Sequence, residues 1–324
     1  MLSHYKNICK LEEFPAYLIT KYIPVKFSKD ESTKQLWEKH NTAIAEKKIS
    51  EELPHSSLLD LKIELASRLY SNCSLCEQNC NVNREHVKGY CNVSTSRIAS
   101  EFLHTGEETI LVPSHTIFFS GCTFKCIFCQ NWDISQYQSG RTIQPKDMAQ
   151  RISDRMKNGS RNVNWVGGDP TPNILFILQT LKHLDEHIPQ IWNSNMYCSI
   201  QTMMLLHGIV DVYLADYKFG RDACAENLSK AKHYNEIITR NIKMADSQAE
   251  VLIRHLIIPN HISCCSLPIL HWIGTNLSHA PINIMDQYQP CYKAKENPLI
   301  NRTITKNEYE TVMTEAKRLG IYII

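Results

Sequence analysis

Several features that would assign a protein to a compartment or a partner are missing from these 324 residues. There is no run of about 18 apolar residues that could cross a membrane. The first residues mix Lys6, Lys10, Glu12 and Glu13 among apolar ones, so they do not form a signal-peptide core. Lysine and arginine number 35 against 33 acidic residues, and the formal charge of +2 gives no general reason to expect nucleic acid or an anionic membrane as a partner. We therefore expect a cytoplasmic protein.

Cysteine, by contrast, is abundant. The chain has 13 cysteines, an odd number, and seven of them fall in two close groups. In a chain of this length such grouping favours metal ligands in a reducing compartment over disulfides. No internal repeat or low-complexity segment is present, and the length allows one large domain or two smaller ones.

Beyond residue 110, short apolar runs alternate with helical patterns, which predicts parallel strands joined by helices. The expected strands are 116–119, 162–166, 191–194, 210–215, 251–258 and 281–285. The expected helices are 145–157, 173–187, 199–206, 266–277 and 305–319, and Thr305 with Glu308 predicts a capping box for the last. A further helical pattern covers residues 31–70. We thus expect an α/β protein with a helical N-terminal extension (1–70), a cysteine-rich segment (71–110) and a barrel domain (111–324).

Glycine and polar residues stand out where the expected strands end. They are the cysteine loop 121–129, Gly167 and Gly168, Asn193 to Asn195, Asp216 and Lys218, Arg254 inside the fifth strand, and 286–288 after the sixth. In parallel α/β barrels the carboxyl ends of the strands form the rim where sites assemble. We therefore expect these residues to lie close together.

The cysteine loop carries Cys122, Cys126 and Cys129 in a C-x3-C-x2-C spacing. Three thiolates on one tight loop can hold three corners of a [4Fe-4S] cluster and leave the fourth iron open to another ligand. A zinc site and three buried apolar cysteines are the alternatives, although zinc lacks an obvious fourth cysteine or histidine beside this loop.

This loop, the run Cys126 to Ser135 and the Gly-Gly-Asp-Pro-Thr-Pro segment 167–172 resemble the radical S-adenosylmethionine (SAM) superfamily. They look most like homologues of pyruvate formate-lyase activating enzyme that carry extra N-terminal cysteines, and the resemblance spans about residues 70 to 324. It implies a partial (β/α)6 barrel of the TIM type and a [4Fe-4S] cluster whose open iron binds SAM. It also implies that Phe128 lies beside the adenine, and that a donor such as flavodoxin or ferredoxin reduces the cluster.

The same resemblance implies SAM contacts at the next strand end. Gly167, Gly168, Asp169 and Pro170 stand where the family has a Gly-Gly-Glu-Pro segment that contacts the amino group of SAM. Glycine lets the backbone approach a ligand closely, and a carboxylate suits an ammonium group. Asp169 replaces the usual glutamate and shortens the reach by one methylene. The alternative is an ordinary turn from strand to helix.

Charged residues on two later strands extend the resemblance. Asp216 and Lys218 match an Asp-x-Lys segment near the SAM carboxylate or an associated cation in the activating enzymes, and Arg254 resembles a family arginine that approaches SAM. Period-two geometry turns Asp216 and Lys218 to one face, and a cation inside an apolar strand needs a partner. A solvated strand end and a structural ion pair are the respective alternatives. His255, on the opposite face, is expected to be packed or at the surface rather than catalytic.

A second group consists of Cys73, Cys76, Cys80 and Cys91. Four thiols can close a metal site with no vacancy for SAM, so its expected roles are electron relay, substrate contact or structure. Iron–sulfur and zinc both stay open, because C-x2-C is also a common zinc half-site. The remaining cysteines have no ligand spacing and are expected to be buried small side chains. They are Cys9, Cys198, Cys224, Cys264, Cys265 and Cys291.

We therefore expect a radical SAM oxidoreductase that cleaves SAM to a 5′-deoxyadenosyl radical and abstracts hydrogen from a substrate. The pattern assigns no catalytic side chain beyond the ligands of the cluster and of SAM. A glycine in a partner glycyl-radical enzyme fits the resemblance, but the extra cysteines depart from it, and another protein, a peptide or a small molecule fits equally. The alternative is a non-catalytic iron–sulfur or zinc scaffold that binds a partner protein. Against it stands the presence of the motifs together at successive strand ends.

Overall fold

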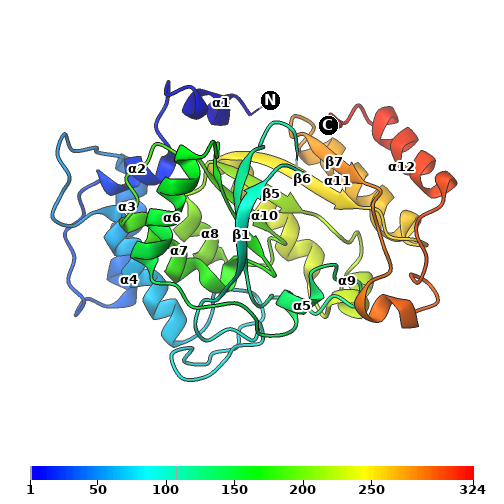
Figure 1. The fold of residues 1–324 in the computed structure, drawn as a ribbon, viewed down its shortest axis with the longest axis horizontal. Coiled ribbons are helices and arrows are strands. Elements are labelled where there is room, and N and C mark those ends of the chain that lie inside the picture. The colour runs from blue at the N-terminus through cyan, green and yellow to red at the C-terminus, as the bar shows by residue number, and fades with distance from the viewer. Residues whose placement is uncertain (1, 107) are drawn as a thin grey trace.

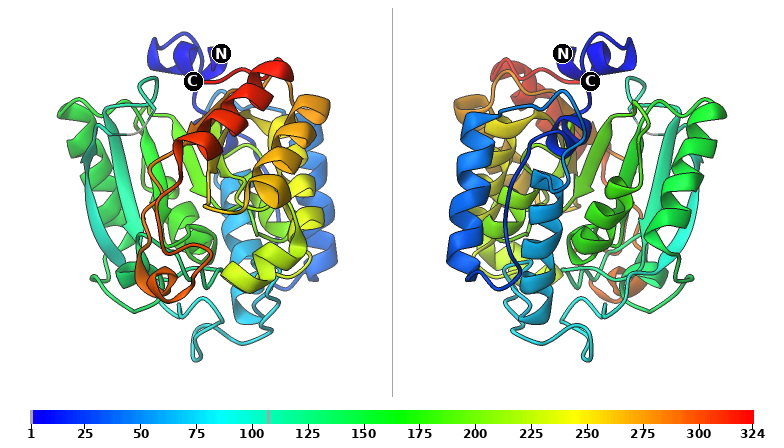
Figure 2. Two further views of the ribbon diagram at one scale, coloured as in Figure 1. Left: turned by 90° about the vertical axis from the view of Figure 1, so that its right-hand side faces the viewer. Right: turned by 90° about the vertical axis from the view of Figure 1, so that its left-hand side faces the viewer.

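The computed structural model describes residues 2–106 and 108–324. Its centre is one sheet with the strand order β1-β2-β3-β4-β5-β6-β7, curved into a partial barrel (Figures 1 and 2). The strands are β1 Ile98–His104, β2 Ser114–Phe119, β3 Val163–Gly167, β4 Gln190–Ser194, β5 Val212–Asp216, β6 Glu250–Leu256 and β7 Ile282–Met285. Strands β2 to β7 pair in parallel, as the sequence predicts for six strands. The barrel is not closed, because β1 and β7 form its two edges.

Strand β1 is the element that the strand pattern misses. It lies within the cysteine-rich segment and pairs antiparallel with β2, with Leu103 opposite His115. Its outer face is partly exposed, and Phe102, 41% exposed, stacks on Phe118 at 5.5 Å between ring centroids. An edge strand of this kind has little apolar alternation of its own, so its pairing with β2 rather than its local pattern defines it.

Helices cover the outside of the parallel strands. They are α5 Trp132–Ser135, α6 Pro145–Lys157, α7 Ile174–Lys182, α8 Ile200–Leu206, α9 Asp222–Ser229, α10 Tyr234–Gln248, α11 Leu267–Asn276 and α12 Lys306–Arg318. Short 3₁₀ helices span Thr171–Asn173 and Tyr292–Glu296, and a π-helical turn spans Ile262–Ser266. All five expected helices are confirmed, but α9 and α10 were not expected, although Ile238, Ile242 and Ala245 bury one face of α10. Within the described residues, none of the helices is long and apolar enough to span a membrane.

The N-terminal extension is helical, as expected for residues 31–70. Its helices are α1 Ser3–Cys9, α2 Ala16–Lys21, α3 Thr33–Glu46 and α4 Leu58–Ser71. Capping boxes formed by Ser32 with Gln35 and by Ser57 with Asp60 begin α3 and α4. Helix α4 packs against α7 and α8 of the barrel. The domain boundaries at residues 70 and 110 stay a prediction.

Helix α1 covers the amino-terminal end of the barrel strands. Leu2 and Tyr5 pack into an apolar cluster with residues of β4, β5 and β6. The Tyr5 N–H donates to a Glu250 carboxylate oxygen at 2.8 Å, and Asn162 Nδ2 donates to Tyr5 Oη at 2.8 Å. Figure 2 shows α1 over one end of the strands and the cysteine-rich segment at the other. Helix α1 therefore covers one end of the barrel, and the cysteine-rich segment covers the other.

The capping box of α12 allows a local test of this fold. Thr305 Oγ1 accepts from the Glu308 N–H at 3.2 Å, and Glu308 Oε2 accepts from the Thr305 N–H at 2.7 Å. We expect Thr305→Ala to cost about 1 kcal/mol of helix stability, which speeds amide exchange in the first turn of α12 about fivefold. Hydrogen–deuterium exchange of α12 peptides measures this. Thr303→Ala, at an exposed position two residues earlier, is the control, and equal exchange in the two variants would contradict the prediction.

Candidate functional site

The cysteine loop leaves the carboxyl end of β2 and is fastened to the end of α9. The Lys125 N–H donates to Ser229 O and the Ile127 N–H donates to Leu228 O, each at 2.9 Å. Because α9 follows β5, these two hydrogen bonds connect the loop after β2 to the segment after β5. The loop is thereby held across the carboxyl ends of the strands.

Each of the three cysteine sulfurs in this loop lies beside a polar side chain. The partners are Asn195 Nδ2 for Cys122 at 3.8 Å, Ser229 Oγ for Cys126 at 3.0 Å, and Ser135 Oγ for Cys129 at 3.6 Å. Hydrogen bonds to sulfur tune the properties of an iron–sulfur cluster. Asn195 follows an expected strand, so its place at the rim is predictable. Ser135 and Ser229 were missed, because serines of ordinary helices carry no such signal.

The thiols of this loop are in a strongly buried environment. Burial raises the pKa of the Cys126 thiol to about 12 and holds the pKa values of Cys122 and Cys129 above their ordinary value. Without a metal these groups are therefore protonated at neutral pH. Metal thiolates form by displacement of the protons, so the site suits a tightly bound iron centre that compensates for desolvation.

The glycine pair after β3 packs directly on the start of the cysteine loop. A Cβ on Gly168 would lie 2.0 Å from Gly121 O, and one on Gly167, whose φ is +118°, would lie 2.1 Å from Phe119 N. The Gly168 N–H also donates to Phe119 O at 2.9 Å. Only glycine permits this approach. Both residues are therefore required by the packing of the loop, whatever ligand they also contact.

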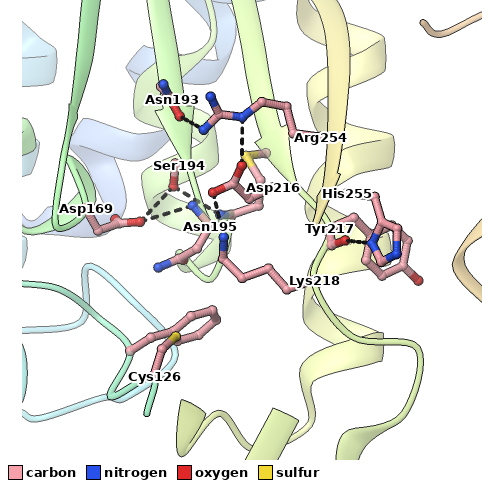
Figure 3. A network of polar contacts seen from close by, with 12 residues as sticks. Cys126, Asp169, Asn193, Ser194, Asn195, Asp216, Tyr217, Lys218, Arg254 and His255 are labelled. Carbon is pink, nitrogen blue, oxygen red and sulfur yellow. Dashed lines mark hydrogen bonds and ion pairs between the residues drawn. The ribbon is translucent and has the colours of Figure 1, made fainter. Parts of the chain in front are cut away.

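Asp169 and Pro170 lie behind the glycine pair. Asp169 is buried, and its carboxylate accepts from the Thr171 N–H at 2.9 Å, from Ser194 Oγ at 3.2 Å and from the Asn195 N–H at 3.2 Å. Burial raises the pKa of this carboxyl group. Figure 3 shows Asp169 directed at Ser194 and Asn195. The observed contacts connect the turn after β3 to the end of β4, which also places Asn195 beside the cysteine loop.

Charged side chains from β5 and β6 form a connected group on the other side of the rim. Lys218 Nζ lies 2.7 Å from Asp216 Oδ2, and Arg254 Nε lies 2.9 Å from Asp216 Oδ1. Arg254 Nη2 donates to Asn193 Oδ1 at 2.7 Å. Figure 3 shows Asp216 between the two cations, with Lys218 on the side toward Cys126.

The charged groups favour one another's ionised forms. Burial favours the neutral form of Asp216, but Arg254 and Lys218 outweigh it and hold the pKa of Asp216 below its ordinary value. Burial also disfavours the Lys218 cation, but Asp216 and Cys126 raise the pKa of Lys218. The two cations at the cavity wall suit an anionic ligand group such as a carboxylate.

His255 has a different environment from its neighbour Arg254. Its Nδ1 lies 2.8 Å from Tyr217 O and its Nε2 lies 2.9 Å from Ser266 Oγ. Burial lowers the pKa of His255 to about 4, so it is neutral. The expectation of a packed histidine is confirmed, and Figure 3 shows it turned away from Asp216 and Lys218.

One cavity of about 380 Å³ connects these features. Phe128 supplies an apolar wall with its ring centroid 6.0 Å from Phe219 and 6.2 Å from Tyr288. The expected site residues that line the cavity are Cys122, Cys126, Cys129, Phe128, Gly167, Gly168, Asp216, Lys218 and Arg254. Asp169 and Pro170 are outside this lining, and a SAM-binding role for all these residues stays a prediction.

The second cysteine group surrounds Gly89. A Cβ on Gly89 would lie 3.5 Å from Cys91 Sγ and 3.6 Å from Cys80 Sγ. Cys76 interacts electrostatically with the other three thiols, and Cys91 interacts with Cys73 and Cys80. The four cysteines, which are close together in the sequence, therefore also form one group in the structure.

The second group adjoins the cysteine loop. The Cys122 N–H donates to Cys91 O at 3.3 Å, and Gln78 Nε2 donates to Thr123 O at 3.0 Å. Tyr90 lies between the two groups, and burial together with thiolates of both groups raises the pKa of its hydroxyl. The two cysteine sites are therefore neighbours, connected through one backbone hydrogen bond and one hydrogen bond from the Gln78 side chain.

The packing of the glycine pair generates a test. We expect Gly168→Ala to displace the cysteine loop, because the new methyl would meet the backbone of Gly121 at 2.0 Å. The expected result is a loss of iron from the Cys122 loop after anaerobic reconstitution, measured as iron per chain. Gly274→Ala is the matched control, because its Cβ would meet Leu319 at an ordinary 3.5 Å. Full iron in Gly168→Ala would contradict the role given to this contact.

Comparison with known proteins gives two sequence relationships. Residues 112–239 match the family described as a 4Fe-4S single cluster domain. An uncharacterised protein of Methanocaldococcus jannaschii, MJ0674, is 47% identical over 336 residues, which cover 100% of this chain and 99% of that protein.

Some solved structures are also similar. Methylornithine synthase (PylB) is 11% identical over 99% of this chain and 78% of its own, with a TM-score of 0.46. A domain of pyruvate-formate lyase-activating enzyme from Bacteroides vulgatus is 15% identical over 50% of this chain and 97% of its own, with a TM-score of 0.42. Streptococcus suis SuiB bound to SAM is 15% identical over 63% of this chain and 47% of its own, with a TM-score of 0.43. Structures with identities and TM-scores as low as these do not show which family the chain belongs to.

The assignment depends on the matched domain, which contains the whole cysteine loop, and on the full-length relative. The chain belongs to the family of the Methanocaldococcus jannaschii protein, and its residues 112–239 match a 4Fe-4S single cluster domain.

Proposed function

We propose that this protein binds SAM at a [4Fe-4S] cluster held by Cys122, Cys126 and Cys129 and cleaves it reductively. The observation that carries the proposal is the single cavity lined by these three thiols together with Lys218 and Arg254. When bound, the cluster and SAM supply electron transfer to the sulfonium, which gives methionine and a 5′-deoxyadenosyl radical that takes hydrogen from a substrate.

The residues of the cavity divide into binding and shielding roles. Lys218 and Arg254 hold the SAM carboxylate, because both cations line the cavity and can donate hydrogen bonds to it. Asp216 keeps both cations oriented through its two carboxylate oxygens. The aromatic wall around Phe128 contacts the adenine and excludes water from the reacting groups.

The first test is formation of 5′-deoxyadenosine from SAM by anaerobically reconstituted, reduced protein. Cys126→Ala removes one of only three thiolate ligands, so we expect its product to fall to the level of a protein-free sample. Cys9→Ala is the matched control, because Cys9 is a half-buried thiol on α1 at the other end of the barrel. We expect it to form product at the wild-type rate.

Two outcomes would contradict the proposal. Undiminished product in Cys126→Ala would exclude the loop as the ligand of the active cluster. Absence of product from wild-type protein that has iron at the loop and retains bound SAM would favour the non-catalytic scaffold.

The second cysteine group, Cys73, Cys76, Cys80 and Cys91, binds a further iron–sulfur cluster in this proposal. Among the described residues, no three of these sulfur atoms lie within 4.8 Å of one another. Sulfurs around one tetrahedral zinc ion are only about 3.8 Å apart, because each Zn–S bond is about 2.3 Å. The wider arrangement suits ligands at separate irons of a cluster.

Arg84 gives independent support for a cluster at this place. Its side chain is 1% exposed and stacks on Tyr70 at 4.4 Å from the ring centroid. Its Nε donates to Val93 O, its Nη1 donates to Pro172 O, and its guanidinium group also interacts with the Cys73 thiol. A buried cation needs a group of opposite charge nearby. The Arg84 cation would offset the negative charge of an adjacent cluster.

The contacts between the two cysteine groups support an electron relay. Cys91 is joined to Cys122 through one backbone hydrogen bond, and Tyr90 interacts electrostatically with thiols of both groups. A reductant that reached the second cluster could therefore pass an electron to the first without contact with SAM.

Metal analysis tests the second cluster. We expect about eight irons per chain in wild type and about four in Cys76→Ala, since each [4Fe-4S] cluster contains four. SAM binding should persist in Cys76→Ala, because its loss affects only the second group. Cys198→Ala, at a buried thiol next to Cys76 in a β-bridge, is the matched control. If Cys76→Ala loses zinc rather than iron, the second cysteine group binds zinc and the proposed cluster is wrong.

The hydrogen donor and the reductant extend the proposal further. The Asp216-Tyr217-Lys218 segment resembles activating enzymes and supports a glycyl-radical enzyme as the protein substrate. A flavodoxin or ferredoxin suits the relay as donor. These partners rest on the resemblance alone, and a cytoplasmic location rests on the composition of the chain.

A further inference from the structure

A third set of metal-ligand side chains lies outside both cysteine groups. Cys224 belongs to α9, and His261 and Cys264 belong to the segment that follows β6. The ligand atoms of these three residues all lie within 4.8 Å of one another. The sequence predicts only buried small side chains for these cysteines, because they lie far apart along the chain and show no ligand spacing. The fold brings α9 and the segment after β6 together.

The distance between the two sulfurs fits one ion. Cys224 Sγ lies 3.6 Å from Cys264 Sγ. Two thiolates bound to one tetrahedral zinc at about 2.3 Å are about 3.8 Å apart. The thiols are therefore spaced for a shared ion without movement of the backbone, and both are half-buried, so an ion can reach them.

His261 contributes one ring nitrogen to this set. It is buried, and its Nδ1 lies 2.8 Å from Pro259 O. A carbonyl can only accept, so Nδ1 carries the proton and Nε2 keeps its lone pair. A ring nitrogen bound to a backbone carbonyl is typical of zinc-binding histidines. Water can take the fourth position of the ion, since the Cys265 thiol interacts with Cys224 but is not among the ligand atoms that lie within 4.8 Å of one another.

The backbone at this place is irregular and tightly packed. The residues Ile262–Ser266 form a π-helical turn, a feature that is frequent at functional sites. A Cβ on Gly220 would lie 2.6 Å from Cys265 O and 2.8 Å from Cys264 O. The segment after β5 is therefore in close backbone contact with the turn that carries Cys264.

We propose that Cys224, His261 and Cys264 bind one zinc ion that joins the segments after β5 and β6. Two thiolates and a neutral imidazole are ligands that zinc prefers, and the two thiolates balance its charge. Binding releases the two thiol protons and involves no change of oxidation state.

The ion would strengthen a connection that leads to the SAM cavity. His255 bridges the same two segments, with Nδ1 at Tyr217 O and Nε2 at Ser266 Oγ. Tyr217 directly precedes Lys218, which lines the cavity. A zinc ion bound by Cys224 and Cys264 would therefore stabilise the position of the segment that carries Tyr217 and Lys218. The site does not depend on the function proposed for the Cys122 loop.

The test uses the full-length protein with its iron–sulfur centres reconstituted anaerobically. The protein is titrated with zinc against a competing chelator, and zinc and iron are counted in the same sample. We expect about one zinc per chain in wild type and at least tenfold weaker binding in Cys224→Ser, Cys264→Ser and His261→Gln. Cys9→Ser is the matched thiol control and should bind zinc as wild type does. The iron count should not change in any variant, which separates this site from the two iron centres.

Thiol alkylation followed by mass spectrometry gives a second readout. Zinc should protect Cys224 and Cys264 from alkylation, and removal of zinc with the chelator should expose both. Absence of zinc binding in wild type, or zinc binding of wild-type strength in all three ligand variants, would overturn the proposal. Recovery of Cys224 and Cys264 as a disulfide from anaerobically prepared protein would overturn it as well.

Discussion

The site depends on one close contact of backbones at Gly121. Three segments meet there: the start of the cysteine loop, the glycine pair after β3 and the cysteine-rich segment. Gly121 O accepts from the Asp169 N–H at 3.0 Å, and a Cβ on Gly121 would lie 2.6 Å from Cys91 O. Side chains at this junction would separate the segments. The absence of a side chain at Gly121 and Gly168 thus fixes where the Cys122 loop lies relative to the second cysteine group.

Charge is distributed around that junction in a complementary way. On the cavity side, Lys218 and Arg254 are paired with Asp216. On the far side, the Arg84 cation lies beside Cys73 and Cys91. Buried anions need cations nearby. The fold therefore places at least one cation, half-buried or buried, beside each cysteine group.

The sequence was most informative where chemistry and periodicity coincide. Six apolar runs followed by glycine or polar residues predicted both the parallel strands and the rim, and nine expected residues line one cavity. The contacts of Asp169 could not be predicted, because they depend on the position of Ser194 at the neighbouring strand end. Ser229 and the set of Cys224 with Cys264 were missed for the same reason. A pattern along the chain reports local geometry, whereas these contacts arise from packing between distant loops.

The N-terminal extension gains a physical role from the open shape of the barrel. Leu2 and Tyr5 of α1 fill the amino-terminal end, and the cysteine-rich segment covers the rim. The remaining feature is a second cavity of about 440 Å³ beside the edge strand β7, lined by Glu108 and Asn283. It shares Gly106, Arg254, Met285 and Gln287 with the site cavity. Because both cavities use Arg254, the Asp216 carboxylate that pairs with this side chain orients a group that faces both of them.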